Sequence, residues 1–469
     1  DDVTIHAFTH IEGARIDKGA SVGPFARIRP KSVIEEKASV GNFIEVNRST
    51  LSAGAKAKHV SYLGDAVIGD NASVVSRNAA AMTLFKQNAL SFGVTYVKPD
   101  VTVKNAQYHR ANINADVNVG MGGFPPSPQV DITPSFSQTV TDIDDVDGVG
   151  QPAVVPNFYF IHPINDDWYL GLSAYSNFGT DMEFKPNYGA PVFGGVTSVA
   201  SVNLGASLAY KVNDRFSIGG GIDVIYGSGE LYRDMDVGVC VGGNILGNEL
   251  EQRCGSVKGN ALDVEAGGIG LGANIGMMYE FNERHRLGLS YKHSPNIDAK
   301  GDIHFAGESY DSLAMPLPDI AEFSGYHRVL PKFALHYSVQ WIGWSAFDSL
   351  KADDQLLKDF QWQDSAHYSI GATWYANERW TLRTGYMFDK TPVDELTSLS
   401  IPDSNRHWLS AGASYQWSSD TTVDIGMTYL IGEDVNVEEY AYEGVPAPMV
   451  TGVTHSNAFL IGAQLSHRF

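Results

Sequence analysis

Two cysteines and fourteen histidines are the residues of this chain that could carry redox or metal chemistry. Cys240 and Cys254 lie close together in one polar, glycine-rich stretch. If this stretch is an extracellular loop, the spacing favours a disulfide formed in an oxidising compartment, and two free thiols are the alternative. The histidines are scattered without the spacing of metal ligands, so we expect neither a metal ion nor a nucleotide cofactor.

The composition limits which elements can position these residues. Hydrophobic residues make up 43% of the chain and the mean hydropathy is −0.15. The chain has no unbroken apolar run of about eighteen residues, which argues against a helical membrane protein. Barrel strands alternate lipid-facing apolar with lumen-facing polar residues and average to such values. The net charge of −21 argues against a nucleic-acid partner, although it would also suit an acidic soluble protein.

The first part of the chain repeats with a period of six. Aliphatic residues return at every sixth position, and small residues follow the first four of them after four positions: Ile16, Val22, Ile28, Ile34, Val40 and Val46, then Ala20, Ala26, Ser32 and Ala38. This spacing is typical of one side of a triangular left-handed β-helix, with aliphatic residues stacked inside and small residues at the corners. We therefore predict a hexapeptide-repeat β-helix fragment over residues 1–72.

Three short sequence strings within these repeats are also distinctive. The strings are Val22-Gly-Pro-Phe-Ala-Arg-Ile-Arg-Pro30, Gly41-Asn-Phe-Ile-Glu45 and His59-Val-Ser-Tyr-Leu-Gly-Asp65. They resemble the acetyltransferase domain of the bifunctional enzyme that makes UDP-N-acetylglucosamine in the bacterial cytoplasm. The resemblance implies that Arg29, His59 and Tyr62 match its sugar-phosphate and catalytic site, while a motif lysine is replaced by Asn47. It ends near Ser73, so we expect a catalytically inert remnant in a fused or spliced chain.

After Leu90 the period becomes two. Alternation is clear in 91–97, 203–210 and 217–226. Short polar turns alternate with long stretches expected to be irregular: the turns at 165–167, 213–215, 282–285, 377–379 and 418–420, and the stretches at about 98–152, 178–199, 234–265, 299–317, 346–365, 390–404 and 434–455. This asymmetry is typical of outer-membrane barrels, and the strand count comes to about fourteen. A large soluble β-protein is the alternative.

A second set of short sequence motifs lies within this larger region. In order along the chain they are Ser76-Arg-Asn-Ala-Ala-Ala81, Pro156-Asn-Phe158, Ser176-Asn-Phe-Gly179, Ser324-Gly-Tyr-His-Arg-Val329 and Ile401-Pro-Asp-Ser-Asn-Arg-His-Trp-Leu-Ser-Ala-Gly412. From about Gly64 to Phe469 the chain resembles the FadL family of long-chain fatty-acid transporters. The resemblance implies a fourteen-stranded barrel that is plugged by an N-terminal hatch. It also implies ligand capture outside the cell and sideways release through a strand kink.

The resemblance assigns two ligand-binding cations. Arg233 follows Gly229-Glu-Leu-Tyr232, and Lys358 lies in Leu356-Leu-Lys-Asp359; both align with the family's carboxylate-contacting cations. A cation paired with a carboxylate in a low-dielectric cavity makes a strong, directional bond. The alternative is that both are solvated loop charges.

The resemblance also assigns the moving parts. The family's hatch motif Asn-Pro-Ala is Asn78, Ala79 and Ala80 here, and without proline, which fixes φ, we expect a looser turn. The kink at the family's lateral opening aligns with Ser176, Asn177, Phe178 and Gly179. A kink there is physically reasonable, because glycine inside a strand often marks a bend. An ordinary strand end is the alternative for this segment.

Together these observations predict an all-β, 14-stranded antiparallel transmembrane β-barrel over 89–469 with a hatch over 64–88, after the β-helix fragment over 1–72. We expect uptake of long-chain fatty acids, no enzymatic activity and no cofactor. A channel for uncharged aromatic hydrocarbons, a remnant sugar-phosphate acetyltransferase and a phage-receptor or adhesion surface are the alternatives.

The expected setting is the outer membrane of a Gram-negative bacterium. We predict a monomer surrounded by outer-membrane lipid and lipopolysaccharide, with the repeats hanging in the periplasm or poorly ordered and the plugging incomplete. The residues from Asp1 onward lack the basic head and apolar stretch of a signal peptide. We therefore expect an exported form to have lost its signal, or the natural start to differ.

Overall fold

The computed structural model describes residues 72–122, 126–394, 396–440 and 448–469 continuously. Before residue 72 it describes shorter pieces: 3–5, 10–22, 27–28, 32–34, 36, 39–40, 45–46, 50–51 and 56–57. Arg29, Asn47, His59 and Tyr62 lie outside the described residues, as do residues 64–71 of the predicted hatch.

The described N-terminal strands are two residues long and pair in parallel. They are β1 (Thr4–Ile5), β2 (His10–Ile11), β3 (Arg15–Ile16), β4 (Ser21–Val22), β5 (Arg27–Ile28), β6 (Val33–Ile34), β7 (Ser39–Val40), β8 (Glu45–Val46), β9 (Thr50–Leu51) and β10 (Lys56–Ala57). They form three sheets, ordered β1-β4-β7-β10, β2-β5-β8 and β3-β6-β9. Thr4 pairs with Ser21 and Ser21 with Ser39, so neighbouring coils are offset by 17 or 18 residues. Three sides of about six residues give this offset.

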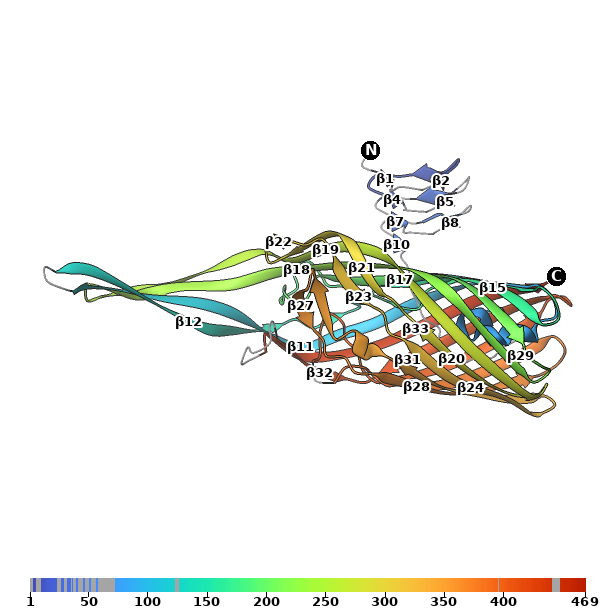
Figure 1. Cartoon of the computed structure of the whole chain (residues 1–469). Coiled ribbons are helices and arrows are strands. Elements are labelled where there is room, and N and C mark those ends of the chain that lie inside the picture. The colour runs from blue at the N-terminus through green and yellow to red at the C-terminus, as the bar shows by residue number, and fades with distance from the viewer. Residues whose placement is uncertain are drawn as a thin grey trace.

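The rest of the chain closes into one antiparallel barrel, as the sequence predicts (Figure 1). Within the described residues, fourteen strands form its wall: β11 (Ala89–Gly122), β14 (Ala153–Pro163), β15 (Trp168–Tyr175), β17 (Val196–Lys211), β18 (Phe216–Ile245), β19 (Asn248–Asn282), β20 (His285–His293), β24 (Ile320–Leu330), β25 (Phe333–Ile342), β28 (Ser365–Tyr375), β29 (Trp380–Asp389), β30 (Arg406–Gln416), β31 (Thr421–Gly432) and β33 (Val450–Arg468). Pairing of β33 with β11, from Ala89 opposite Arg468 to Tyr108 opposite Val450, closes the ring. Closure pairs the first wall strand with the last, so the sheet has no free terminal strand in lipid.

Alternation along each strand explains why this sequence forms a wall. In β17, Leu204 and Leu208 are exposed on the outside, whereas Asn203 and Ser207 are buried. The outside therefore presents apolar side chains to lipid and the inside carries the polar ones. The predicted short turns are built on asparagine, whose side-chain oxygen accepts a bond from the backbone N–H three residues on: Asn165 from Trp168, Asn213 from Phe216 and Asn377 from Trp380.

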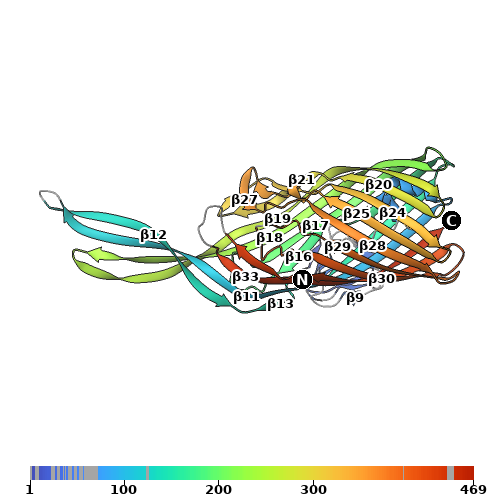
Figure 2. The same cartoon turned by 90° about the horizontal axis from the view of Figure 1, so that it is seen from below.

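Two of the stretches that the sequence predicts to be irregular are instead long strands. Most of 98–152 and 234–265 is strand, because β11 and β12 (Ser127–Ile143) form one long hairpin and β18 and β19 form another. The hairpins run side by side as an arm, with residues 112–119 of β11 parallel to residues 238–245 of β18. Figures 1 and 2 show the arm projecting beyond the barrel end opposite the C-terminus. The strands of the arm carry many polar residues and glycines, which obscure the alternation of apolar and polar residues in the sequence.

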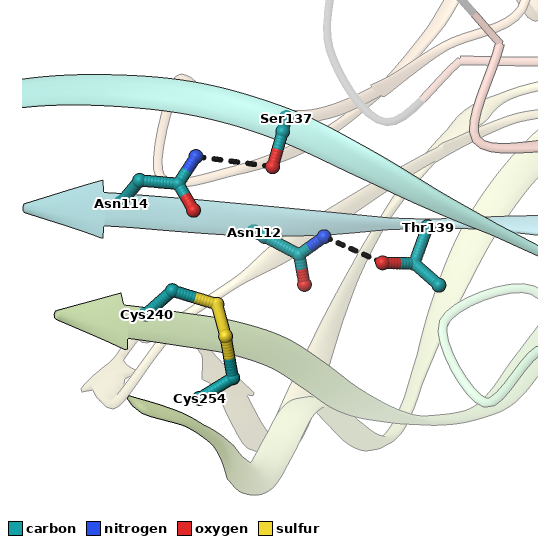
Figure 3. The surroundings of a disulfide bond; sticks show 6 residues. All are labelled: Asn112, Asn114, Ser137, Thr139, Cys240 and Cys254. Carbon is teal, nitrogen blue, oxygen red and sulfur yellow. Dashed lines mark hydrogen bonds between the residues drawn. A yellow bond between two sulfur atoms is a disulfide. The ribbon is translucent and has the colours of Figure 1, made fainter. Parts of the chain in front are cut away.

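The cysteines lie within this arm rather than in an irregular loop. Cys240 of β18 and Cys254 of β19 face each other across the ladder and form a disulfide. On the same face, Asn112 donates a hydrogen bond to Thr139 (2.8 Å) and Asn114 to Ser137 (3.0 Å) (Figure 3). The disulfide ties β18 to β19 and the side-chain bonds tie β11 to β12, while backbone pairing of β11 with β18 joins the two hairpins.

Shorter elements fill the loops near the base of the arm. They are β13 (Val146–Asp147), β16 (Gly179–Glu183), β21 (Asn296–Phe305), β22 (Glu308–Ser309), β23 (Leu313–Pro316), η2 (Trp344–Ala346), β26 (Ser349–Ala352), β27 (Gln355–Asp359) and β32 (Val435–Glu439). The strands β21, β23, β26 and β27 pair in that order. They carry one predicted site residue, Lys358, while β18 carries the other, Arg233.

Candidate functional site

The hatch comprises two short helical segments inside the barrel, α1 (Val74–Arg77) and η1 (Ala79–Leu84). Asn78 lies between them, and its side-chain oxygen accepts a bond from the backbone N–H of Ala80 (3.1 Å). Its side-chain nitrogen donates to the carbonyls of Met277 (3.1 Å) and Leu289 (3.3 Å) on the wall. Asn78 therefore both caps η1 and ties the hatch to the wall without the proline of the family motif.

Wall glycines make room for the hatch. A Cβ at Gly219 of β18 would lie 2.6 Å from the Ala80 nitrogen and 2.7 Å from the Ala79 carbonyl carbon. A Cβ at Gly276 of β19 would lie 2.1 Å from Oδ1 of Asn78. Since real Cβ atoms do not approach other heavy atoms so closely, the hatch packs where these two strands lack side chains.

An ion pair joins the hatch to the lumen wall, and a second ion pair lies nearby within the wall. Arg77 of the hatch lies 3.4 Å from Glu322 of β24, which also accepts a bond from Gln340 (2.7 Å). Nearby, Lys292 of β20 donates to Tyr175 and lies 3.7 Å from Asp223 of β18. We call Arg77, Asp223, Lys292 and Glu322 the hatch cluster. Pairing is what makes buried charges of this kind tolerable.

The predicted kink residues interrupt a strand. Ser176, Asn177 and Phe178 separate β15 from β16, and both strands pair with β17. Tyr175 opposes Asn203 whereas Gly179 opposes Ala200, so this side carries one extra residue, as in a bulge. Ser201 holds the bulge, because its hydroxyl accepts a bond from the Phe178 N–H (3.1 Å).

The other edge of the interrupted strand has a gap in its ladder. Pairing of β14 with β15 ends at Phe158 opposite Ala174, and pairing resumes at the bridge between Gly150 and Met182. Between these points the wall has a side gap, and Pro156 has no N–H with which to fill it. A cavity of about 100 Å³ lies here, lined by hatch, kink and wall residues, among them Arg77, Asn157, Tyr175, Ser176, Asn177 and Lys292.

A larger cavity of about 670 Å³ adjoins the same hatch residues, Ser76 and Arg77. Its lining extends from the hatch, β11 and β14 to strands β28, β29, β30, β31 and β33. Polar side chains of the wall face it, including Thr373, Arg383, Ser414, Asp424 and Gln464. The hatch thus packs against β14–β19 and leaves free volume beside the opposite wall.

Arg233 lies beyond the part of β18 needed to cross a membrane, for which about eleven residues from Phe216 suffice. Its guanidinium donates to the carbonyls of Val196 (2.5 Å) and Tyr232 (2.6 Å) and to the Thr197 hydroxyl. Burial lowers the pKa of Arg233 to about 10, and the charge of Glu439 opposes this shift. The side chain is therefore still a cation at neutral pH.

Lys358, on β27, forms an ion pair with Glu439, the last residue of β32. Glu439 is 3% exposed and also accepts bonds from the Ser398 hydroxyl (2.8 Å) and the Leu399 N–H (2.9 Å). We call Arg233, Lys358, Ser398 and Glu439 the loop cluster. The structure thus brings both predicted cations into the field of one carboxylate.

Apolar side chains surround the loop cluster on two sides. One group, which includes Phe184, Tyr188, Phe193, Leu399 and Val437, packs beside Glu439. The other group includes Leu231, Ile297, Met315, Leu357 and Phe360 on the side of Lys358. The loop cluster thus combines charged side chains with apolar side chains packed beside them.

Sequence reasoning missed Glu439 and the acidic members of the hatch cluster. In Val435–Glu439 the valines alternate with polar residues, and Glu439 lies on the valine face, so alternation alone marks it as a buried carboxylate. Asp223 likewise lies at a lumen-facing position of an alternating strand. Which cation each carboxylate meets depends on strand register, which local sequence does not reveal.

Other kinds of site are not found in the described part of the chain. It has no group of three or more histidine, cysteine or acidic side chains placed to hold a metal ion. Among the same residues, none of the helices combines the length and hydropathy needed to span a membrane.

Comparisons with known proteins agree with this architecture. A family model described as "Outer membrane protein transport protein (OMPP1/FadL/TodX)" matches residues 37–469. The long-chain fatty acid transport protein of Escherichia coli (strain K12) is 32% identical over 439 residues, which cover 85% of this chain and 91% of that protein. The outer membrane protein P1 of Haemophilus influenzae is 30% identical over 441 residues, covering 87% and 92%.

Solved structures share the fold. A Pseudomonas aeruginosa FadL homologue superposes with a TM-score of 0.68 at 20% identity, covering 85% of this chain and 94% of that one. The toluene transporter TodX of P. putida gives a TM-score of 0.56 at 14% identity, covering 87% and 95%.

Proposed function

Because this chain belongs to the OMPP1/FadL/TodX family of outer-membrane transport proteins, we propose that it takes up long-chain fatty acids. The chain is an outer-membrane β-barrel transporter. The observation that supports a fatty-acid cargo is the loop cluster, where Arg233 and Lys358 share the field of Glu439 and apolar groups pack nearby. A fatty acid needs both features, a cation for its head and apolar surface for its tail.

The proposed path uses the features in order. A fatty acid enters among the extracellular loops and places its carboxylate at the loop cluster. Displacement of the hatch then opens the lumen, and the ligand leaves through the side gap between β14 and the bulge at 176–178. The free volume beside the hatch supports incomplete plugging, and the gap in the ladder supports lateral release.

Binding of labelled oleate to the purified full chain tests this proposal, beside a chain that starts at Gly64. Saturable binding by both, competed by other long-chain acids, supports the transporter and marks the repeats as dispensable. Binding by the shorter chain alone means that the repeats obstruct the site. Absence of binding by both, with toluene bound instead, contradicts fatty-acid cargo.

Uncharged aromatic hydrocarbons are the second candidate cargo. Glu439 already neutralises Lys358 in this structure, and an uncharged ligand would leave that pair undisturbed. Oleate and toluene compared on the same preparation separate the two cargoes.

For the N-terminal region, we propose that residues 1–72 are an acetyltransferase remnant without activity. The parallel pairing at offsets of 17 or 18 residues supports a β-helix fragment. Turnover of acetyl-CoA with glucosamine-1-phosphate by the full chain would contradict an inert remnant. The proposed transport unit is one chain in lipid and lipopolysaccharide, since one chain closes the barrel.

A further inference from the structure

We propose that Glu439 is an internal competitor of the ligand: its carboxylate occupies the carboxylate-binding position and must leave before a fatty acid binds. The inference rests on the proposed function, because it assumes a cargo with a carboxylate. It assigns a specificity role to a residue that the sequence analysis did not identify.

The donors around Glu439 form a complete receptor for a carboxylate. Lys358 supplies an ammonium group, Ser398 a hydroxyl at 2.8 Å and Leu399 a backbone N–H at 2.9 Å. Lys358 also donates to the Ser398 hydroxyl (3.2 Å), which orients both groups. A cation combined with neutral donors is how proteins hold a desolvated carboxylate.

A ligand carboxylate and Glu439 cannot use these donors together. The surroundings are apolar, and two like charges that share donors at low dielectric repel strongly. Binding of the acid therefore requires the Glu439 carboxylate to withdraw from these donors. An uncharged ligand meets no such requirement.

One further donor remains unused beside Glu439. The hydroxyl of Tyr188 is buried and has no hydrogen-bond partner among the described residues. Burial, and after it the charge of Glu439, raise the pKa of Tyr188 to about 12, so it keeps its proton. A buried hydroxyl left unpaired is costly, and a second carboxylate arriving in this space would satisfy it.

Withdrawal of Glu439 does not require the wall to move. β32 lies outside the fourteen wall strands and pairs with β33 through its backbone, from Val435 opposite Thr454 to Glu439 opposite Val450. Rotation of the Glu439 side chain breaks its three contacts and leaves this pairing intact. Displacing the Glu439 carboxylate therefore breaks only the bonds of its side chain.

The competitor sets a threshold on chain length. An incoming acid exchanges one carboxylate for another at the same donors, so its head alone gains little. The net gain comes from the tail, through burial of apolar surface beside Leu231, Met315 and Phe360. Long-chain acids are accepted, whereas acetate and butyrate fail to displace Glu439.

The test is Glu439→Gln in the full chain, with Glu438→Gln as the matched control. Glu438 is the exposed neighbour on the opposite face of β32, so the two variants change net charge equally. Kd values are measured for oleate, butyrate and oleyl alcohol. We expect Glu439→Gln to tighten oleate binding about tenfold and to make butyrate binding detectable, because the competing carboxylate is gone. Oleyl alcohol binding should stay within about twofold, and Glu438→Gln should match the parent.

A second variant guards against misfolding. Glu439→Asp keeps the charge but shortens the side chain, and should tighten oleate binding by less than Glu439→Gln. Oleate binding that is unchanged or weaker in both variants would overturn the competitor while leaving fatty-acid transport standing. A parent chain that binds oleyl alcohol or toluene but not oleate would overturn the proposed function, and the competitor with it.

Discussion

The two buried charge clusters use the same kinds of side chain but are held in different ways. In the hatch cluster, Asp223, Lys292 and Glu322 project from wall strands whose backbones are paired on both sides. In the loop cluster, Lys358 and Glu439 lie on β27 and β32, outside the wall. Wall strands cannot shift without opening the barrel, whereas loop strands can. Rearrangement therefore suits the loop cluster, and Arg77 is the member of the hatch cluster that does not lie on a wall strand.

Charge reversal in the loop cluster should have the largest effect. With both Arg233→Glu and Lys358→Glu, oleate Kd should rise at least about 100-fold, since each charged hydrogen bond contributes roughly 1.5–3 kcal/mol. Equilibrium binding of labelled oleate measures this, with heat-modifiable gel mobility to confirm a folded barrel. The milder Lys358→Met serves if the double variant does not fold. Unchanged oleate affinity would remove both residues from the site.

Adding a side chain at Gly219, where the hatch packs against the wall, should have the next largest effect. Gly219→Val places a side chain where Ala79 and Ala80 now lie, so the hatch cannot seat and ion conductance should rise several-fold. Gly426→Val on β31 is the matched control, because a Cβ there meets no atom nearer than 4.0 Å. Planar-bilayer conductance measures both. Equal conductance in the two variants would mean that the packing at Gly219 does not hold the hatch.

Breaking the hatch ion pair should have a smaller effect. Arg77→Met removes the cationic partner of Glu322, which costs the closed hatch about 1–3 kcal/mol and should raise the frequency of opening. Oleate affinity should change little, because the loop cluster is untouched. Single-channel recording beside oleate binding checks both expectations. A large loss of oleate affinity would show that the clusters are coupled and not separate.

The smallest effect on transport should come from the disulfide. Cys240→Ser with Cys254→Ser opens a loop with a sequence separation of 14, worth about 3 kcal/mol to local order of the arm. Limited proteolysis should cut the arm faster, while oleate affinity stays within about twofold. Reduction of the parent chain should reproduce this pattern. A marked fall in oleate affinity would extend the ligand site into the arm.

Much of the fold was readable from sequence, and the failures were specific. Alternation and asparagine turns predicted the fourteen-stranded wall, because each strand must place apolar residues toward lipid at every second position. The arm was missed because its strands carry polar side chains on one face and many glycines, which weaken the same signal. Whether the repeats before residue 72 derive from an acetyltransferase stays a prediction.

The sequence by itself determined the barrel, whereas the roles of Arg233, Lys358 and Asn78 were assigned by family resemblance and stay predictions. Tertiary structure alone decided that Glu439 pairs with Lys358 and acts electrostatically on Arg233, that Arg77 meets Glu322, and that the wall has a side gap beyond Phe158. The physical reason is register. Which residues face one another across strands far apart in sequence depends on how the barrel closes, and no local pattern encodes that.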